Sequence, residues 1–217
     1  MTEKVFQNNQ AVIAGEVVSA FTFSHELYGE GFYNVDLKVS RLSETYDIIP
    51  VMISERIIDI KQSYIGKKIE VKGQFRSYNK HEEYKNRLIL SLFAREVREM
   101  EDDEEYVKPN QIFLDGFICK KPIYRMTPLG REIADILLAV NRAYGKSDYI
   151  PCICWGRNAR FAGNLEVGGH IQLWGRIQSR QYQKRVSDEE VVNRVAYEIS
   201  VSKIECIEDD DNDFAEE

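Results

Sequence analysis

Asn9-Gln10-Ala11-Val12-Ile13-Ala14-Gly15 returns in a diverged form as Asn110-Gln111-Ile112-Phe113-Leu114-Asp115-Gly116, at an offset of 101 residues. The same offset relates Asp47-Ile48-Ile49-Pro50 to Asp148-Tyr149-Ile150-Pro151. A period this long indicates a duplicated domain, because the units of solenoid repeats run to about 20–50 residues. The 217 residues therefore predict two domains of roughly 100 residues, each large enough to bury one modest core.

Both halves show the same order of predicted elements: three strands, a short helix and two longer strands. The predicted strands cover 11–18, 33–39, 48–53, 68 onward and 87–95, with a helix over 54–64, and then 111–118, 134–140, 149–155, 170 onward and 194–204, with a helix over 158–165. A five-stranded barrel with a helix between its third and fourth strands is the OB-fold. Gly73 and its counterpart Gly175 interrupt the fourth strands, as expected at barrel corners. The predicted fold class is all-β, with two tandem OB-fold barrels.

The acidic residues are concentrated in two segments. The net charge is −7, but residues 99–105 hold six acidic residues and residues 205–217 hold eight, without a basic residue in either. The rest of the chain carries 29 Lys and Arg against 22 acidic residues. Such acidic runs are typical of solvated, disordered segments. The predicted organisation is a diverged N-terminal OB-fold (1–98), an acidic linker (99–108), a C-terminal OB-fold (109–205) and a disordered acidic tail (206–217).

Composition and motifs argue against several other classes of protein. Met1–Gln10 is polar and does not resemble a signal peptide, and no apolar run approaches the roughly 18 residues of a membrane helix. Cys152 and Cys154 alternate along a strand, and nothing nearby completes a zinc site, so a buried, reduced pair is expected in the cytoplasm. Phosphate-binding, dinucleotide-binding and Gly-x-Ser-x-Gly motifs are missing from the sequence. We therefore expect a cytoplasmic, nucleoid-associated protein that is not an enzyme and needs no cofactor or metal.

The fourth strand of the second half carries the strongest functional pattern. Ile171, Leu173, Gly175 and Ile177 share one parity and are expected to face the core. The opposite parity bears rings, cations and amides: Gln172, Trp174, Arg176, Gln178, Arg180, Tyr182 and Lys184. Aromatic rings stack on unpaired bases and cations follow the phosphates, so this row predicts a face for single-stranded nucleic acid. The alternative is an ordinary strand face on which Trp174 fills a satellite cluster or a subunit contact.

Three further groups extend the candidate face. The first half offers a corresponding row, Lys72, Gln74, Arg76, Tyr78 and Lys80, which is poorer in rings and is expected to bind more weakly. A second group combines Trp155 and Phe161 with the arginines between them, Arg157 and Arg160. Whether Phe161 meets ligand or packs its helix onto the barrel is left open. The third is a basic loop, residues 120–128, that contains Tyr124 and Arg125.

Several of these stretches resemble the bacterial single-stranded DNA-binding protein family. They are Asn110-Gln111, Tyr124–Gly130, Leu138-Ala139-Val140-Asn141-Arg142, Tyr149–Cys152 with Trp155-Gly156-Arg157, and Gly175–Arg180. The match runs in order through residues 110–204, whereas the first half matches only through the internal repeat. The resemblance implies a protein that coats and protects single-stranded DNA in replication, recombination or repair, with Trp155, Phe161 and Tyr182 as stacking rings. Members usually gather four OB-folds, so a chain with two is expected to form a homodimer.

The candidate DNA-binding set that results covers both halves. It comprises Tyr124, Arg125, Arg142, Trp155, Arg157, Arg160, Phe161, Trp174, Arg176, Arg180, Tyr182 and Lys184, with Lys72, Arg76, Tyr78 and Lys80 in the first half.

The acidic tail is a second candidate site. The resemblance implies that Asp209, Asp210, Asp211, Asp213 and Phe214 dock replication and repair proteins. Family tails close on the phenylalanine, whereas Ala215-Glu216-Glu217 follow here, so plain solubilising acidity is the alternative.

Two other functions remain open at this stage. One is an OB-fold adaptor that contacts proteins through the same aromatic face, and the other is an RNA-binding or primosomal OB protein. Comparing dT with rU oligomers separates DNA from RNA binding, because the sequence does not encode which sugar is met.

Overall fold

The computed structural model describes residues 7–41, 43–82, 85–101, 104, 108–185 and 191–207, except for the side chains of 80–82, 85, 86 and 184. The first half contains β1 (Asn9–Val17), β2 (Thr22–Leu27), β3 (Glu30–Ser40), β4 (Tyr46–Ser54), β5 (Lys68–Glu82) and β6 (Lys85–Glu99). The second contains β7 (Asn110–Ile118), β8 (Ile123–Met126), β9 (Glu132–Asn141), β10 (Ser147–Trp155), α1 (Arg157–Ala162), β11 (His170–Arg185) and β12 (Val191–Cys206), with a 3₁₀ turn at Ala143–Gly145. Among the described residues, no helix has the length and apolarity needed to cross a membrane.

Each half closes into a barrel. In the first half, β1 pairs with both β3 and β5, and β3–β4–β6–β5 completes the ring. In the second half, β7 pairs with both β9 and β11, and β9–β10–β12–β11 completes it. The β4–β6 and β10–β12 pairs are parallel, and the other pairs are antiparallel. The structure thus confirms the prediction of two tandem OB-fold barrels.

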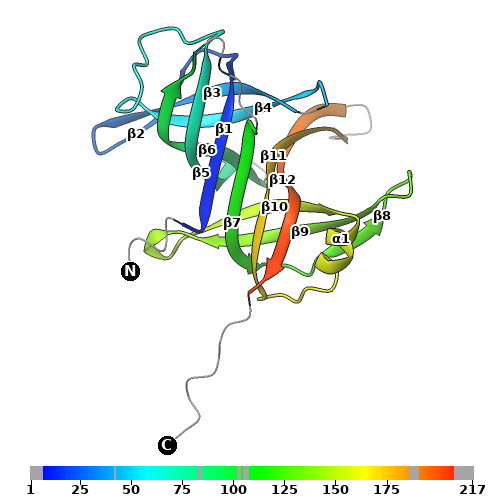
Figure 1. Ribbon diagram of the computed structural model, residues 1–217. Helices are drawn as coiled ribbons and strands as arrows, with labels where there is room; N and C mark the ends of the chain where they lie inside the picture. Colours follow the sequence, from blue (N-terminus) through cyan, green and yellow to red (C-terminus); the bar gives the residue numbers. More distant parts are fainter. Residues whose placement is uncertain are drawn as a thin grey trace, which may run out of the picture.

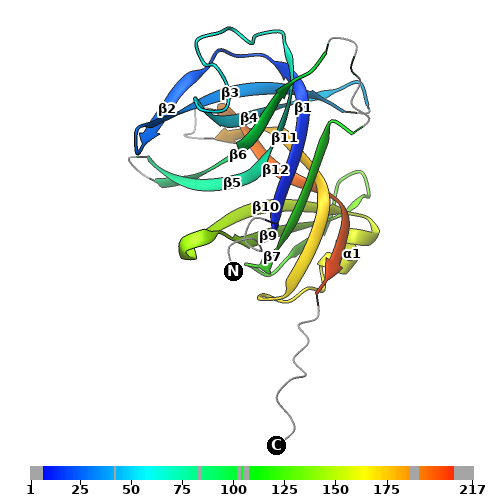
Figure 2. The ribbon, with the colours of Figure 1, turned by 60° about the vertical axis from the view of Figure 1, so that its left-hand side comes forward.

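The two barrels form one continuous sheet of twelve strands. β1 and β7 run side by side (Figures 1 and 2). They are antiparallel, and Ala11 lies opposite Ile112. The long hairpin of each barrel also reaches its neighbour: β5 packs against β10, and β11 packs against β4. The repeat therefore produces two copies whose outer surfaces meet.

The core follows the predicted alternation. Ile171, Leu173 and Ile177 are fully buried, and Ile13 and Phe75 are fully buried in the first barrel. Both fourth strands carry a bulge at the expected glycine, between Lys72 and Gly73 and between Trp174 and Gly175. The inward parity is as predicted, whereas Gln178 and Gln74, which the sequence places in the outward rows, are buried.

The helix predicted over 54–64 is wrong, since this segment forms turns and α1 is the only α-helix in the described residues. Ser54 does cap the backbone of Arg56, at 3.1 Å, but its hydroxyl also donates to Glu30. Asp59 then closes a second turn by accepting from the backbone of Lys61 at 3.1 Å. These local side-chain bonds compete with helix formation, and three isoleucines in the segment lower its helix propensity.

Two strands were not predicted. β2 forms a hairpin with β3, and β8 forms one with β9. The sequence interpretation treated residues 120–128 as a loop because this four-residue strand carries no apolar alternation. β8 is exposed along its whole length, so it projects from the barrel as an arm.

The acidic segments are described only in part. β6 extends to Glu99, the first residue of the predicted linker, and Glu104 accepts two hydrogen bonds from Arg98 at 2.8 and 2.9 Å. These bonds lower the pKa of Glu104. The tail residues Asp209, Asp210, Asp211, Asp213 and Phe214 lie outside the described residues, and docking through them stays a prediction.

Candidate nucleic-acid interface

One group of candidate residues gathers around α1 and the adjacent edge of the second barrel. Trp155 ends β10 opposite Ile133 of β9, which lies opposite Arg125 of β8. The indole is 39% exposed, although it stands beside a buried isoleucine. We call this group the α1 cluster; it consists of Tyr124, Arg125, Trp155, Arg157, Arg160 and Phe161.

α1 presents a divided surface. Ala159 and Ala162 are completely buried against the barrel, while Phe161 is 42% exposed. The alanines supply the packing contact, which leaves a large part of the Phe161 ring open to solvent. Exposed rings of this kind can stack on unpaired bases.

Glu132 holds two members of the α1 cluster in place. Its carboxylate accepts from Arg160 Nε at 2.8 Å and from the Tyr124 hydroxyl at 2.7 Å. The hydrogen bond from Arg160 and then that from Tyr124 lower the pKa of Glu132. Arg125 is similarly engaged with Asp135, at 3.0 Å. Arg157 is exposed and forms no ion pair within the described part of the chain, so it is the cluster's best-placed cation for a phosphate.

The outward row of β11 is not one uniform face. Trp174 is half-buried, with its ring centroid 5.1 Å from that of Phe113 and the Lys203 ammonium 4.4 Å from it. Arg180 is exposed, 3.8 Å from Glu198 and 5.9 Å from the half-buried Tyr182 ring. Neither tryptophan nor Tyr182 is sealed inside the core. The side chain of Lys184 lies outside the described residues.

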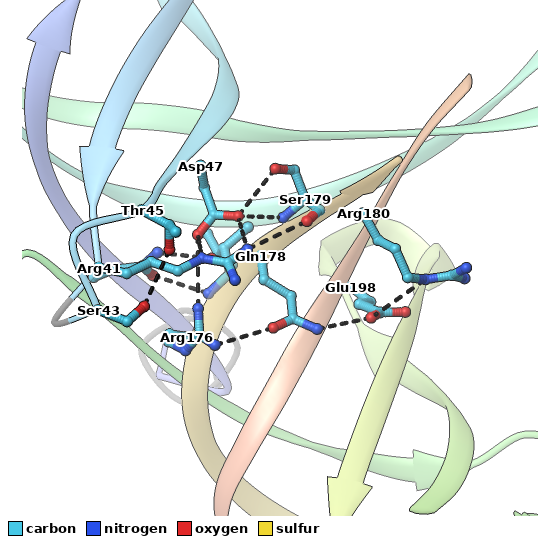
Figure 3. Close-up of polar contacts among 11 residues, drawn as sticks. Arg41, Ser43, Thr45, Asp47, Arg176, Gln178, Ser179, Arg180 and Glu198 are labelled. Carbon is cyan, nitrogen blue, oxygen red and sulfur yellow. Dashed lines mark hydrogen bonds and ion pairs between the residues drawn. The ribbon is translucent and has the colours of Figure 1, made fainter. Parts of the chain in front are cut away.

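Between those ends, β11 contributes to a junction with the first barrel. Asp47 is fully buried and accepts from the Ser179 backbone at 2.7 Å and from the Ser179 hydroxyl at 2.9 Å. Arg41 donates to Asp47 at 2.7 Å, and Arg176 lies 3.6 Å from it. Figure 3 shows this network continuing through Gln178 and Glu198 to Arg180. Arg176 thus lies at the junction between the barrels, with its side chain 38% exposed.

An equivalent arrangement is found with the roles of the two barrels exchanged: an aspartate of the second barrel binds a serine of the first. Asp148 is fully buried and accepts from the Ser77 backbone of the first barrel at 2.6 Å. Arg142 lies 3.2 Å from Asp148 and donates to the Ser77 carbonyl at 3.5 Å. We call this junction between the barrels the seam. It consists of Arg41, Asp47, Ser77, Arg142, Asp148 and Ser179.

The seam was missed at the sequence level, although a signal was present. Asp47 and Asp148 belong to the repeated motif, and Arg41 and Arg142 precede them at the same spacing. Arg142 was grouped with the DNA-binding residues, whereas the structure places it half-buried between the barrels.

The first-barrel row is also more aromatic than its own strand suggests. The Arg76 guanidinium carbon lies 4.0 Å from the ring centroid of Phe93 on the neighbouring strand β6. The ring centroids of Phe93 and Phe32 are 5.8 Å apart. Burial, followed by the charges of Arg95 and Arg142, lowers the pKa of Arg76 to about 10.

The other members of this row differ in their surroundings. Tyr78 is 46% exposed, and Lys72 lies 3.9 Å from Glu70 and 3.6 Å from Glu96. The side chain of Lys80 is not described.

Comparison with known proteins finds similarity to one family over the second barrel. Residues 109–207 match the model of the Single-strand binding protein family. The chain is 38% identical over 94 residues to Single-stranded DNA-binding protein 2 of Listeria innocua. This alignment covers 38% of this chain and 59% of that protein. It is 33% identical over 96 residues to Single-stranded DNA-binding protein A of Bacillus subtilis, covering 41% and 56%. The chain thus spans little more than half the length of these relatives.

A solved structure resembles both barrels together. The wild-type single-stranded DNA binding protein from Thermus aquaticus superposes with a TM-score of 0.74, over 93% of each chain, at 17% sequence identity. A deletion mutant of that protein gives a TM-score of 0.73. At this identity the likeness establishes the two-barrel fold.

Proposed function

We propose that this chain binds single-stranded DNA with little sequence preference, because residues 109–207 match the model of the Single-strand binding protein family. It acts without catalysis, coating and protecting the strand in the cytoplasm during replication, recombination or repair. The observation that carries the proposal is the α1 cluster, where the exposed rings of Trp155 and Phe161 flank the exposed guanidinium of Arg157. Exposed rings and cations gathered in one cluster suit bases and phosphates of a flexible strand.

The bound strand follows the outer surface of the second barrel. The α1 cluster supplies stacking contacts at one end, and Arg180 and Tyr182 supply them where the β11–β12 hairpin leaves the barrel. Lys72 and Tyr78 extend the path onto the first barrel. Arg142 of the seam contributes positive potential rather than direct stacking, as do Arg76 and Arg176, which lie beside the seam.

The proposal is tested by titrating the protein with dT oligomers while tryptophan emission is recorded. We expect quenching, and an affinity that falls with salt with a log–log slope of about −0.7 per phosphate contact. Replacing Trp155 by Ala should weaken binding by about 1–3 kcal/mol, the range known for single-strand binders, OB-fold proteins of this class included.

The matched control for this experiment is Tyr28→Ala, which removes a ring that is 95% exposed but lies at the β2–β3 turn. It should leave dT affinity unchanged. A wild-type affinity that shows no dependence on salt, or equal losses in the two variants, contradicts the proposal. Tighter binding of rU than dT at matched salt would instead identify an RNA-binding protein.

We also propose that two chains associate, which brings four barrels together as the family resemblance implies. Light scattering at micromolar concentration should then give twice the chain mass of 25.3 kDa. A particle with the mass of one chain contradicts the dimer and leaves the DNA-binding proposal intact.

A further inference from the structure

A cavity of about 730 Å³ opens beside the seam. Its walls come from both barrels, since Arg41 of the first barrel lines it together with Phe113 of β7 and with Trp174 and Arg176 of β11. Neither barrel forms the cavity alone. Its volume is in the usual range of small-molecule sites, about 300–1,000 Å³, which is the size class of a single nucleotide.

The cavity offers an aromatic surface. Trp174 and Phe113 are paired across β11 and β7, with their ring planes inclined by 46°. The equivalent positions of the first half, Lys72 and Val12, are also paired across their strands but provide no ring. The aromatic pair is therefore particular to the second barrel, although the surrounding backbone is duplicated.

The charge of the cavity is positive. Arg41, Lys108 and Arg176 line it, and no Asp or Glu is among its described lining residues. Arg41 and Arg176 share one carboxylate, that of Asp47. Arg176 Nη1 is buried and, within the described residues, has no hydrogen-bond acceptor. Two guanidiniums with one counter-charge leave an excess of positive charge that suits a phosphate.

We propose that this cavity takes one nucleotide of a single strand as the strand crosses from one barrel to the other. The base lies against Trp174 and Phe113, and the phosphate meets Arg41, Lys108 and Arg176. This site rests on the proposed DNA binding and adds a contact that only the assembled pair of barrels provides. It is separate from the α1 cluster, to which it contributes no residue.

The chain has two tryptophans, which allows each site to be observed alone. Trp155→Phe keeps a ring at the α1 cluster and leaves Trp174 as the only indole, and Trp174→Phe does the converse. In the Trp155→Phe protein, dT oligomers should quench Trp174, whereas an abasic oligomer of equal length and charge should not. Trp174→Ala should weaken dT affinity about tenfold, the scale of one lost base stack.

The outcomes separate this inference from the proposed function. Quenching of Trp155 in the Trp174→Phe protein, with Trp174 unaffected in the Trp155→Phe protein, overturns the cavity site and leaves DNA binding standing. No quenching and no binding in either protein overturns both. Equal quenching of Trp174 by dT and abasic oligomers also overturns the site, because it excludes base stacking as the cause.

Charge is tested at Lys108, whose side chain is exposed at the cavity. Lys108→Gln should make the salt slope shallower by about 0.7, as expected for the loss of one phosphate contact. Lys61→Gln, at an exposed position between β4 and β5, is the matched control and should leave the slope unchanged. The same slope in both variants rules out a phosphate at Lys108.

Discussion

Replacing Asp47 by Ala is expected to lower the free energy of unfolding by about 3–5 kcal/mol, the usual cost of removing one partner from a buried ion pair. The carboxylate is fully buried and joins Arg41 of its own barrel to Ser179 of the other. Its loss leaves the backbone N–H of Ser179 without its acceptor. It also removes the carboxylate that the guanidiniums of Arg41 and Arg176 share, so these two positive charges lose their counter-charge. Urea unfolding followed by circular dichroism measures the change.

The duplicated aspartate provides a matched comparison, because the two carboxylates differ electrostatically. Burial raises the pKa of Asp47, but the hydrogen bonds from Arg41 and Ser179 outweigh it and leave the pKa below its ordinary value. Burial also raises the pKa of Asp148, and there the bonds from Ser77 and the charge of Arg142 do not compensate. Asp47→Asn should therefore cost more stability at neutral pH than Asp148→Asn.

The pH dependence of the two variants should have opposite signs. Ionised Asp47 stabilises the fold above its ordinary pKa of about 3.9, and this stabilisation is lost as the pH falls through the lowered folded pKa. The stability gap between wild type and Asp47→Asn should shrink in acid. Ionised Asp148 is disfavoured in the fold, so wild type gains relative to Asp148→Asn as the pH falls through the raised pKa.

Asp135→Asn is the control for this comparison. It removes a surface partner of Arg125, a kind of pair that contributes about 0–1 kcal/mol. Parallel pH profiles for Asp47→Asn and Asp148→Asn would contradict the electrostatic difference. A loss at Asp47 no larger than that at Asp135 would contradict the role of the seam.

The sequence predicted the barrels well from two signals, the hydrophobic alternation along each strand and the internal repeat. Neither signal depends on how the two barrels pack together. Alternation places Ile171, Leu173 and Ile177 inside, and their complete burial confirms it. The repeat predicted that the second barrel copies the first. Neither alternation nor the repeat predicts how one barrel packs against the other. That packing determines which outward side chains remain accessible to solvent. Arg176 has the correct parity for an open face but lies where the first barrel approaches.

A face of a sheet also draws on several strands, which single-strand analysis does not combine. The first-barrel row was judged poor in rings from β5 alone. Phe93 on β6 and Phe32 on β3 supply rings next to Arg76, and His25 of β2 stacks on Phe32 at 5.0 Å. These neighbours follow from strand pairing, which the sequence does not specify before the barrel is assembled. The weaker binding of the first barrel therefore stays a prediction, because the residues of β5 alone do not determine how many rings its face presents.

Gly175→Ala and Gly73→Ala should each cost about 3 kcal/mol, at the upper end of the usual cost of overpacking. A Cβ at Gly175 would overlap the Ser200 carbonyl oxygen, and one at Gly73 would overlap that of Phe93. In both cases the obstacle is the backbone of the neighbouring strand, which cannot rotate away as a side chain can. Urea unfolding of the two variants measures the cost.

Gly130→Ala separates this steric effect from backbone strain. Gly130 has φ +73° and nothing within 4 Å of a built Cβ, so only the left-handed conformation is penalised, by about 1–2 kcal/mol. A loss at Gly73 or Gly175 no larger than at Gly130 would contradict the overlap with the neighbouring strand.

The two bulge glycines are equivalent for stability but not for the cavity. Gly175 lies between Trp174 and Arg176 and lines the cavity, whereas Gly73 follows Lys72 and does not. A backbone shift at Gly175 moves the indole away from Phe113, so Gly175→Ala should reduce the quenching of Trp174 by dT oligomers. Gly73→Ala should retain that quenching at the same loss of stability. Because both substitutions bring a Cβ against a carbonyl of the neighbouring strand at equivalent bulges, a difference in quenching between them can be assigned to the cavity rather than to a weakened fold.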